Sequence, residues 1–129
     1  MPNMANIVVK KADGTTNYTF TALAGAPGDG VFAQWRGEGS TPALSADLRT
    51  KVVWNSKRNA RRTEGFVSIP KVETVAGVPT VTSRTPSSLS ITIPDNLTAT
   101  EAADYVAITC NAYSSALIRQ IMAEGTNAR

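Results

Sequence analysis

The amino-acid sequence predicts an α+β fold in which the helices follow an antiparallel sheet. Residues 7–94 form a series of short runs in which apolar and polar side chains alternate, and this is the period of a strand with one buried face. From residue 98 the apolar positions recur at steps of three and four, which is the period of an amphipathic helix. Strands followed by helices are typical of a sheet with its helices on one face. The length of 129 residues suits a single domain spanning 1–129.

The first two runs, 7–11 and 16–23, predict an N-terminal β-hairpin. Asp13-Gly14 lies between them, and this dipeptide favours a tight turn in which both central residues have positive φ.

Four further runs predict the rest of the sheet, at 31–36, 45–55, about 63–72 and 81–94. The connection at 73–80 is expected to be a long hairpin loop. We expect the last strand to be interrupted or bulged at Pro86, and the strand pairing to fray at Pro70. Alternation places Trp35 and Trp54 on an apolar face, where we expect them to be core residues. The opposite face is polar and carries Gln34, Arg36, Arg49, Lys51, Asn55, Glu64, Phe66, Ser88 and Ser90.

The segment KRNARR at 57–62 is the most basic part of the chain. The window 49–62 holds six of the 13 Lys and Arg residues and no acid. A positive loop beside a polar sheet face is suited to nucleic-acid phosphates, and an ordinary solvated hairpin loop explains the same charges. Asp47 and Glu64 are the acids of the polar face, and we expect them to be salt-bridge partners of its basic residues. Phe32 and Phe66 share this face, where they either stack on a base or pack within the protein.

The C-terminal segment begins with a predicted capping box, in which Thr98 is the N-cap and Glu101 bonds back to it. Gly125 is the expected C′ residue. The polar stretch 111–115 leaves open whether this segment is one helix or two. Its apolar stripe is predicted to contribute to the core or to a dimer contact through Val106, Tyr113, Leu117 and Ile121. The stripe is too narrow to cover the whole sheet, so we expect a second copy of the chain to supply the remaining cover.

The composition argues against an enzyme. The chain has no His and a single Cys, so a His/Cys metal site, a Cys-His pair and an intrachain disulfide are excluded, and we expect no cofactor, metal or small-molecule substrate. Cys110 is expected to be a small buried apolar residue. No stretch is long and apolar enough to span a membrane, and the N-terminus lacks the features of a secretory signal. We therefore expect a protein made in a cytosol, with no membrane partner.

The ordered combination of these features resembles the coat proteins of single-stranded RNA bacteriophages (levivirus-type). The resemblance spans nearly the whole chain and is carried by DGVFAQW at 29–35, the basic loop, VSIPKVETVAGVP at 67–79 and SLSITIP at 88–94 before the helices. It implies an N-terminal hairpin, a five-stranded sheet, and an interlocked homodimer with a continuous ten-stranded sheet. It also implies an icosahedral shell, assembled in the cytoplasm of a bacterial host, that packages single-stranded genomic RNA against the inward polar face. In many members this face also binds an RNA hairpin and represses translation.

The resemblance implies that the inward face carries Arg49, Lys51, Val53, Asn55, Glu64, Phe66, Pro86, Ser88 and Ser90. With the charges of the basic loop, we expect RNA contacts by Arg49, Lys51, Asn55, Lys57, Arg58, Arg61, Arg62, Phe66, Ser88 and Ser90. Val53, Phe66 and Pro86 are apolar where the family's pattern leads one to expect hydrogen-bonding or stacking groups, which argues against a specific hairpin more than against bulk RNA. The alternative function is a non-capsid RNA-binding module that uses its sheet face without forming shells.

Overall fold

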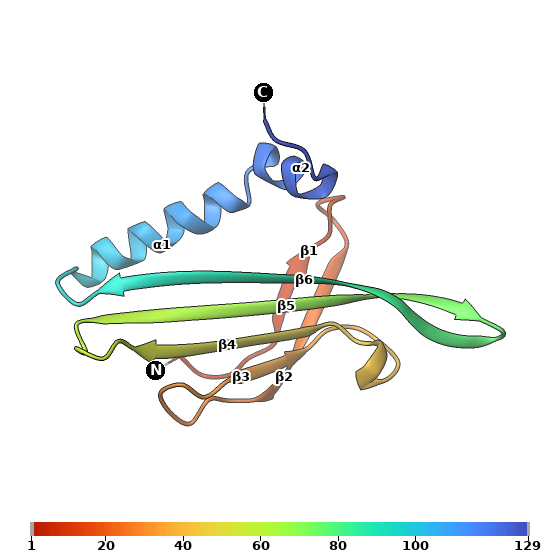
Figure 1. Ribbon diagram of the computed structural model, residues 1–129, viewed down its shortest axis with the longest axis horizontal. Helices are drawn as coiled ribbons and strands as arrows, with labels where there is room; N and C mark the ends of the chain where they lie inside the picture. Colours follow the sequence, from red (N-terminus) through yellow and green to blue (C-terminus); the bar gives the residue numbers. More distant parts are fainter. Residues whose placement is uncertain (1, 129) are drawn as a thin grey trace. The chain divides into compact units, whose positions relative to one another are not determined.

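A computed structural model describes residues 2–128 of the chain (Figure 1). The chain divides into two compact units, Met1–Thr92 and Ile93–Arg129. The first unit carries the sheet and the second carries the two helices. The α+β prediction is therefore confirmed, whereas the single domain over 1–129 stays a prediction.

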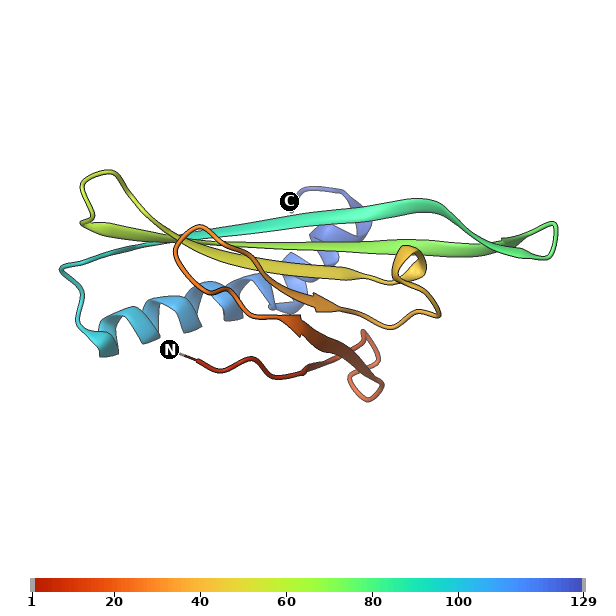
Figure 2. The ribbon, with the colours of Figure 1, turned by 90° about the horizontal axis from the view of Figure 1, so that it is seen from below.

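The sheet has six strands, each beside its neighbour in sequence. They are β1 (Ile7–Lys10), β2 (Asn17–Ala24), β3 (Ala33–Arg36), β4 (Asp47–Trp54), β5 (Ala60–Val75) and β6 (Val78–Pro94), with a short 3-10 helix at Pro42–Leu44. β2 serves two partners, because Asn17–Phe20 pair with β1 and the residues from Thr21 onward pair with β3. The result is the predicted N-terminal hairpin joined to a five-stranded sheet, β2 to β6. Figure 2 shows that β5 and β6 run beyond the ends of the other strands.

The turn between β5 and β6 corrects the expected long loop at 73–80. Only Ala76 and Gly77 separate the two strands, with φ of 52° and 80°. Positive φ at both central positions matches the right-handed twist of paired strands, so the strands continue to the turn itself. The sequence pattern hides this because Ala is an unusual residue at positive φ.

The strand β6 is not interrupted at Pro86, whereas the β4–β5 pairing ends at Ser68, two residues before Pro70, as fraying there predicts. β6 is continuous through Pro86, and as the last strand of the sheet in this chain it has one unpaired edge, where proline is best tolerated. Pro70 lies beyond Ser68, which is the end of the pairing between β5 and β4, so the missing N–H costs no bond on that side. β5 also begins at Ala60, earlier than the predicted residue 63.

The β1–β2 connection is wider than the tight turn predicted at Asp13-Gly14. Lys11 N donates to Thr16 O at 2.9 Å, and Gly14 N donates to Lys11 O at 2.9 Å. Gly14 has φ of 73°, whereas Asp13 does not have positive φ. The Asp13 carboxylate instead accepts hydrogen bonds from the amides of Thr15 and Thr16 and from the Thr16 hydroxyl. A side chain that binds the backbone in this way stabilises the wider loop.

The helical unit contains two helices, which answers the question left open by the sequence. α1 (Ala99–Tyr113) ends at Ser114, and α2 (Ala116–Glu124) begins after Ser115, whose hydroxyl accepts from the amide of Ile118. Thr98 is the N-cap of α1 as predicted, although Glu101 Oε1 contacts the Thr98 hydroxyl rather than its amide. Gly125 ends α2 with φ of 68°, the left-handed conformation expected of a C′ glycine.

Few side chains of this chain are buried. Among the described residues the buried ones with side chains are Phe20, Ala33, Ala46 and Ser45, and neither helix contains a buried residue. Trp35 and Trp54 are half-buried in the single chain, and their predicted role in a core or a dimer contact stays a prediction. Cys110 is exposed, which corrects the prediction of a buried thiol. In α1 and α2, Val106 and Ile121 are half-buried and Tyr113 and Leu117 are exposed, and their role in a core or in a dimer contact stays a prediction.

Candidate nucleic-acid interface

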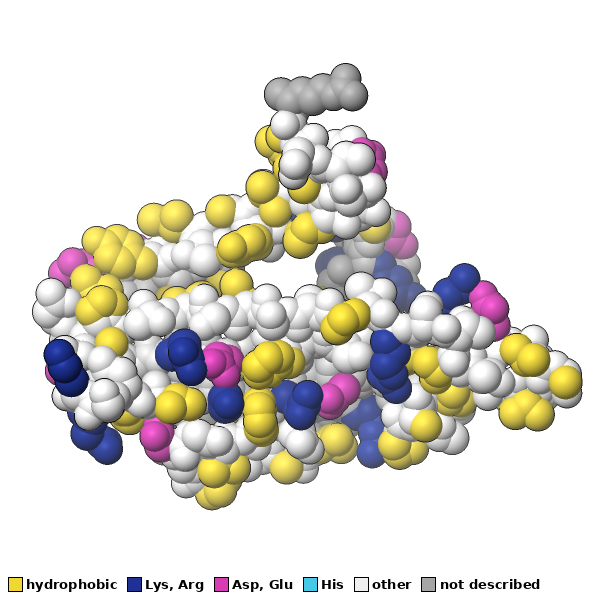
Figure 3. Space-filling model, in the orientation of Figure 1, with side chains coloured by type: hydrophobic (Ala, Val, Ile, Leu, Met, Phe, Trp, Pro, Cys, Tyr) yellow, Lys and Arg dark blue, Asp and Glu magenta, His cyan; other side chains and the backbone are white. Residues whose placement is uncertain are grey.

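The strand register assigns the side chains of β3, β4 and β5 to two faces. Gln34 lies opposite Arg49, which lies opposite Phe66, and Lys51 lies opposite Glu64. Directly opposite residues of antiparallel strands share a face. The polar face is therefore the one predicted from alternation, and in Figure 3 basic, acidic and hydrophobic side chains alternate over this part of the sheet. We call it the β4–β5 polar face, defined by Asp47, Arg49, Lys51, Arg62, Glu64, Phe66 and Ser68.

Glu64 joins two basic residues of this face. Its Oε1 lies 2.8 Å from Arg62 Nε, two residues earlier on β5, and its Oε2 lies 3.3 Å from Lys51 Nζ on β4. Asp47 Oδ2 lies 3.1 Å from Arg49 Nε in an ionic contact without hydrogen-bond geometry. The predicted salt-bridge roles of Asp47 and Glu64 are confirmed. Much of the positive charge of the face is therefore balanced within the sheet.

An aromatic pair lies beside these ion pairs. The rings of Phe32 and Phe66 meet edge to face, with centroids 5.9 Å apart. Arg49 Cζ lies 5.1 Å from the centroid of Phe32, and Lys51 Nζ lies 5.0 Å from the same centroid. Cations over an aromatic face are attracted by its quadrupole. The two rings were predicted either to stack on a base or to pack within the protein. In this structure they pack against each other and against the cations of Arg49 and Lys51.

The loop between β4 and β5 is closed by Asn55. Its backbone N donates to Ala60 O at 3.0 Å, and its side-chain Oδ1 accepts from Asn59 N at 2.9 Å and from Ala60 N at 3.3 Å. Asn55 was predicted to contact RNA, but in this structure its amide oxygen is occupied by the loop. Arg58 has φ of 54° in this loop, in the left-handed region that Gly14 occupies in the β1–β2 loop.

The basic segment 57–62 is divided between the two faces of the sheet. Arg61 lies opposite Trp54, and its Cζ is 5.3 Å from the Trp54 ring, while Arg58 Cζ is 5.5 Å from the same ring. Arg62 is on the β4–β5 polar face with Glu64. Lys57 is exposed in the loop, and within residues 2–128 no ion pair is formed by Lys57, Arg58 or Arg61. These three cations have no ion-pair partner among the described residues, although the Asp29 carboxylate accepts from Trp54 N at 3.1 Å at the same end of the sheet.

The structure thus brings Arg49, Lys51, Arg62 and Phe66 together on one face. It does not bring Arg58 and Arg61 to that face, and Ser88 and Ser90 are exposed on β6. Arg84 was missed by the sequence analysis. Its guanidinium donates to Ala43 O at 3.0 Å and to Ser68 Oγ at 3.4 Å, which places a further cation at the end of the polar face. Arg84 is an even number of residues from Ser88 and Ser90 on β6. Strand alternation therefore puts its side chain on the same face, and the sequence could have predicted it.

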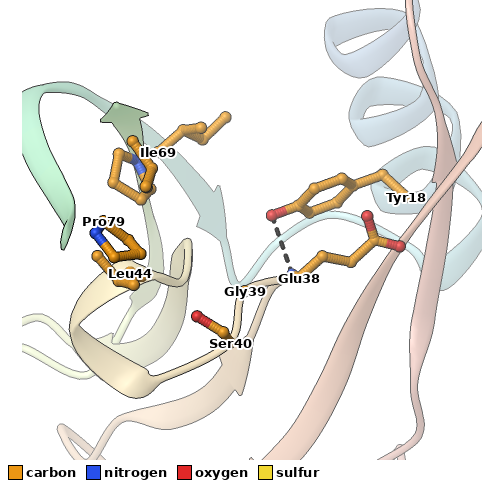
Figure 4. Close-up of a pocket in the computed structure, with 9 residues that line it drawn as sticks. Tyr18, Glu38, Gly39, Ser40, Leu44, Ile69 and Pro79 are labelled. Atoms are coloured by element: carbon orange, nitrogen blue, oxygen red, sulfur yellow. Dashed lines mark hydrogen bonds between the residues drawn. The ribbon is translucent and has the colours of Figure 1, made fainter. Parts of the chain in front are cut away.

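A shallow pocket of about 400 Å³ lies elsewhere in the sheet unit (Figure 4). Leu44, Ile69 and Pro79 line it, and the Tyr18 hydroxyl accepts from Glu38 N at 3.0 Å at its rim. Its lining lacks a paired acid and base, so it offers no catalytic arrangement. Among the described residues no group of His, Cys, Asp and Glu is arranged to hold a metal. Neither helix in the described part of the chain is long and apolar enough to cross a membrane.

The fold is that of the coat proteins of RNA bacteriophages, as the resemblance implied. The chain is similar to the subunit of a "Virus-like particle of Beihai levi-like virus 21", with a TM-score of 0.85 and 19% identity over 99% of both chains. It is also similar to the bacteriophage GA capsid protein, with a TM-score of 0.77 and 16% identity over 95% of both chains. A third similar structure, at a TM-score of 0.69 and 16% identity over 96% of both chains, is described as an unassembled virus coat protein dimer and an RNA-binding dimer. No family model and no curated protein sequence matches the chain.

Proposed function

We propose that this protein is a structural, non-enzymatic coat protein that forms a homodimer, assembles into a closed shell and packages single-stranded RNA. The observation that carries the proposal is the likeness over 99% of both chains to the subunit of a virus-like particle. Because the match covers 99% of both chains, it includes every domain of the two, and this favours the same structural role. The proposed location is the virion, after assembly in the cytoplasm of a bacterial host.

The apolar surface of the single chain supports dimerisation. On the sheet face opposite the β4–β5 polar face, Val52 is 43% exposed and Ile69 is 47% exposed. In the helical unit Ile108, Leu117 and Met122 are each about 60% exposed. Large apolar side chains that stay exposed on a soluble chain mark surfaces for protein contact, and a second copy that supplies both a sheet and helices would cover them.

The charge distribution supports contact with RNA in bulk. Lys57, Arg58 and Arg61 have no acidic partner in the described chain, and phosphate neutralisation needs only charge. Among the basic residues of the polar face, Arg49, Lys51 and Arg62 already have acidic partners. We therefore assign part of the sequence-independent RNA contact to the exposed loop at 55–60, which lies at the end of the sheet.

Expression of the full chain tests the proposal. We expect particles in size-exclusion chromatography and negative-stain electron microscopy, with nuclease-protected host RNA inside. A stable 13.6 kDa monomer would overturn the coat-protein function. A stable dimer that binds RNA and never forms particles would favour the non-capsid RNA-binding module instead.

A charge-reversal pair tests the assignment to the loop. Lys57→Glu with Arg58→Glu should lower the RNA content of the particles, measured by the ratio of absorbance at 260 and 280 nm. Lys10→Glu with Lys11→Glu changes the net charge equally at the β1–β2 hairpin and should leave RNA content closer to that of the wild type. Equal RNA content in the two double variants would remove the loop from the packaging mechanism.

A further inference from the structure

We propose that Glu64 is a built-in competitor of RNA for Lys51 and Arg62, and that it sets the affinity of the β4–β5 polar face for nucleic acid. The inference rests on the proposed function, because it assumes that this face meets RNA. Besides the basic residues that promote RNA binding, this face would then contain one residue, Glu64, that weakens it.

The geometry of Glu64 suits this role. Each carboxylate oxygen contacts a different cation, Arg62 Nε at 2.8 Å and Lys51 Nζ at 3.3 Å. The Glu64 side chain is only 17% exposed, whereas Lys51 and Arg62 are 27% and 56% exposed. Glu64 is thus the least exposed side chain of the group. Water and salt screen such a half-buried charge less than they screen an ordinary surface pair.

This arrangement changes what a phosphate encounters at the sheet. Lys51 and Arg62 carry two positive charges, but Glu64 already contacts both, so neither cation is free to bind a phosphate while these contacts hold. An RNA phosphate that binds either cation must compete with an anion already in contact with it. The number of phosphates that the face neutralises is therefore smaller than its number of basic residues, and the salt dependence of binding reports that number.

The same strand contains a matched comparison. Glu73 Oε1 lies 2.8 Å from Lys71 Nζ, again two residues apart on β5, but both side chains are well exposed and the pair involves a single cation. Glu73→Gln and Glu64→Gln remove the same charge from the same strand with the same isosteric change. Only Glu64→Gln releases two cations on the polar face.

The test measures binding of a fluorescent 12-residue oligouridylate to the unassembled full chain between about 50 and 300 mM salt. Glu64→Gln should bind more tightly, and its plot of log K against log salt should be steeper by up to about 1.4, since each phosphate neutralised on a single strand contributes about 0.7. Glu73→Gln should keep the wild-type slope. Particles of Glu64→Gln should also contain more RNA per subunit.

A double-variant cycle separates competition from a general charge effect. Lys51→Gln should make the slope shallower by about 0.7 in the Glu64→Gln background and change it little in the wild-type background. Equal effects in both backgrounds, or equal slopes for Glu64→Gln and Glu73→Gln, would overturn the inference.

Two further measurements keep the outcomes distinct. Thermal unfolding shows whether Glu64→Gln folds. If it does not, Glu64→Asp is used instead, because it keeps the charge but moves the carboxylate away from the two cations by one methylene. Its slope should be steeper than that of the wild type, but by less than the value of about 1.4 expected when both cations are free. An unchanged slope in Glu64→Asp would then overturn the inference. If the wild-type protein forms particles and binds RNA, and the Glu64 variants bind RNA as the wild type does, this inference alone is contradicted. Wild-type protein that does neither contradicts the proposed function as well.

Discussion

Arg61 lies directly across the β4–β5 ladder from Trp54, with its guanidinium carbon 5.3 Å from the centroid of the indole ring. Its neighbour Arg62 points to the opposite face and contacts Glu64. Two adjacent arginines of one basic segment therefore have different surroundings. One packs on an aromatic ring, and the other belongs to an ion-pair group on the polar face.

The Arg61–Trp54 contact should contribute to stability. Arg61→Ala is expected to lower the free energy of unfolding by about 0.5–1 kcal/mol, the size of a partly exposed cation–π contact. Lys57→Ala, in the same basic segment but without a ring beneath it, should change stability by less than about 0.5 kcal/mol. Urea unfolding at a fixed protein concentration measures both. Equal stabilities of the two variants would show that the ring contact contributes nothing.

The β5–β6 turn should be sensitive at Gly77. This residue has φ of 80°, and an added Cβ would meet nothing within 4 Å, so the cost of Gly77→Ala is backbone strain alone. We expect a loss of about 1–2 kcal/mol in thermal or urea unfolding. Ala76, at φ of 52°, offers the reverse experiment, and Ala76→Gly should be neutral or stabilising. A stabilising effect of Gly77→Ala would contradict the turn geometry.

A close approach rather than a special φ constrains Gly37. A Cβ there would lie 2.7 Å from the Cβ of buried Ala46 and 2.4 Å from the Tyr18 hydroxyl. Gly37→Ala is therefore expected to destabilise the sheet unit by about 1–3 kcal/mol through overpacking. Gly28→Ala is the control, because an added Cβ at Gly28 meets nothing within 4 Å and Gly28 does not have positive φ. A Gly37→Ala variant as stable as Gly28→Ala would show that this packing is not tight.

Asp13 should give the β1–β2 hairpin an acid-sensitive stability. Hydrogen bonds from the Thr16 side chain, then from the Thr16 and Thr15 amides, lower the pKa of Asp13 from 3.8 to about 2. Because the pKa is lower in the folded state, the stabilisation is fully present above about pH 4 and is lost as the pH falls through about 2. Asp13→Asn should be less stable than the wild type at neutral pH, and the difference should narrow between pH 4 and 2.

The control for this prediction is Asp95→Asn, which removes an exposed carboxylate outside the hairpin. Thermal unfolding at several pH values measures both variants. A stability difference between Asp13→Asn and the wild type that does not depend on pH in this range would contradict the role of the ionised carboxylate.

Local patterns carried much of the prediction. Thr98 and Gly125 were recognised as helix ends because capping depends on residues within one turn. The connections were harder to predict, since Asp13-Gly14 has the composition of a tight turn but forms a wider loop, and Ala76-Gly77 lacks that composition but forms a tight turn. Turn width depends on the pairing of the flanking strands as well as on the turn residues.

The sequence by itself determined which side chains of β4 and β5 share a face, because strand alternation depends only on the order of residues in one segment. It therefore placed Lys51 and Glu64 on the polar side. Only the tertiary structure decided that Glu64 lies opposite Lys51, that Arg61 lies over Trp54, and that Phe32 holds two cations. Register joins segments that are distant along the chain, so it is set by the packing of the whole sheet rather than by either segment alone.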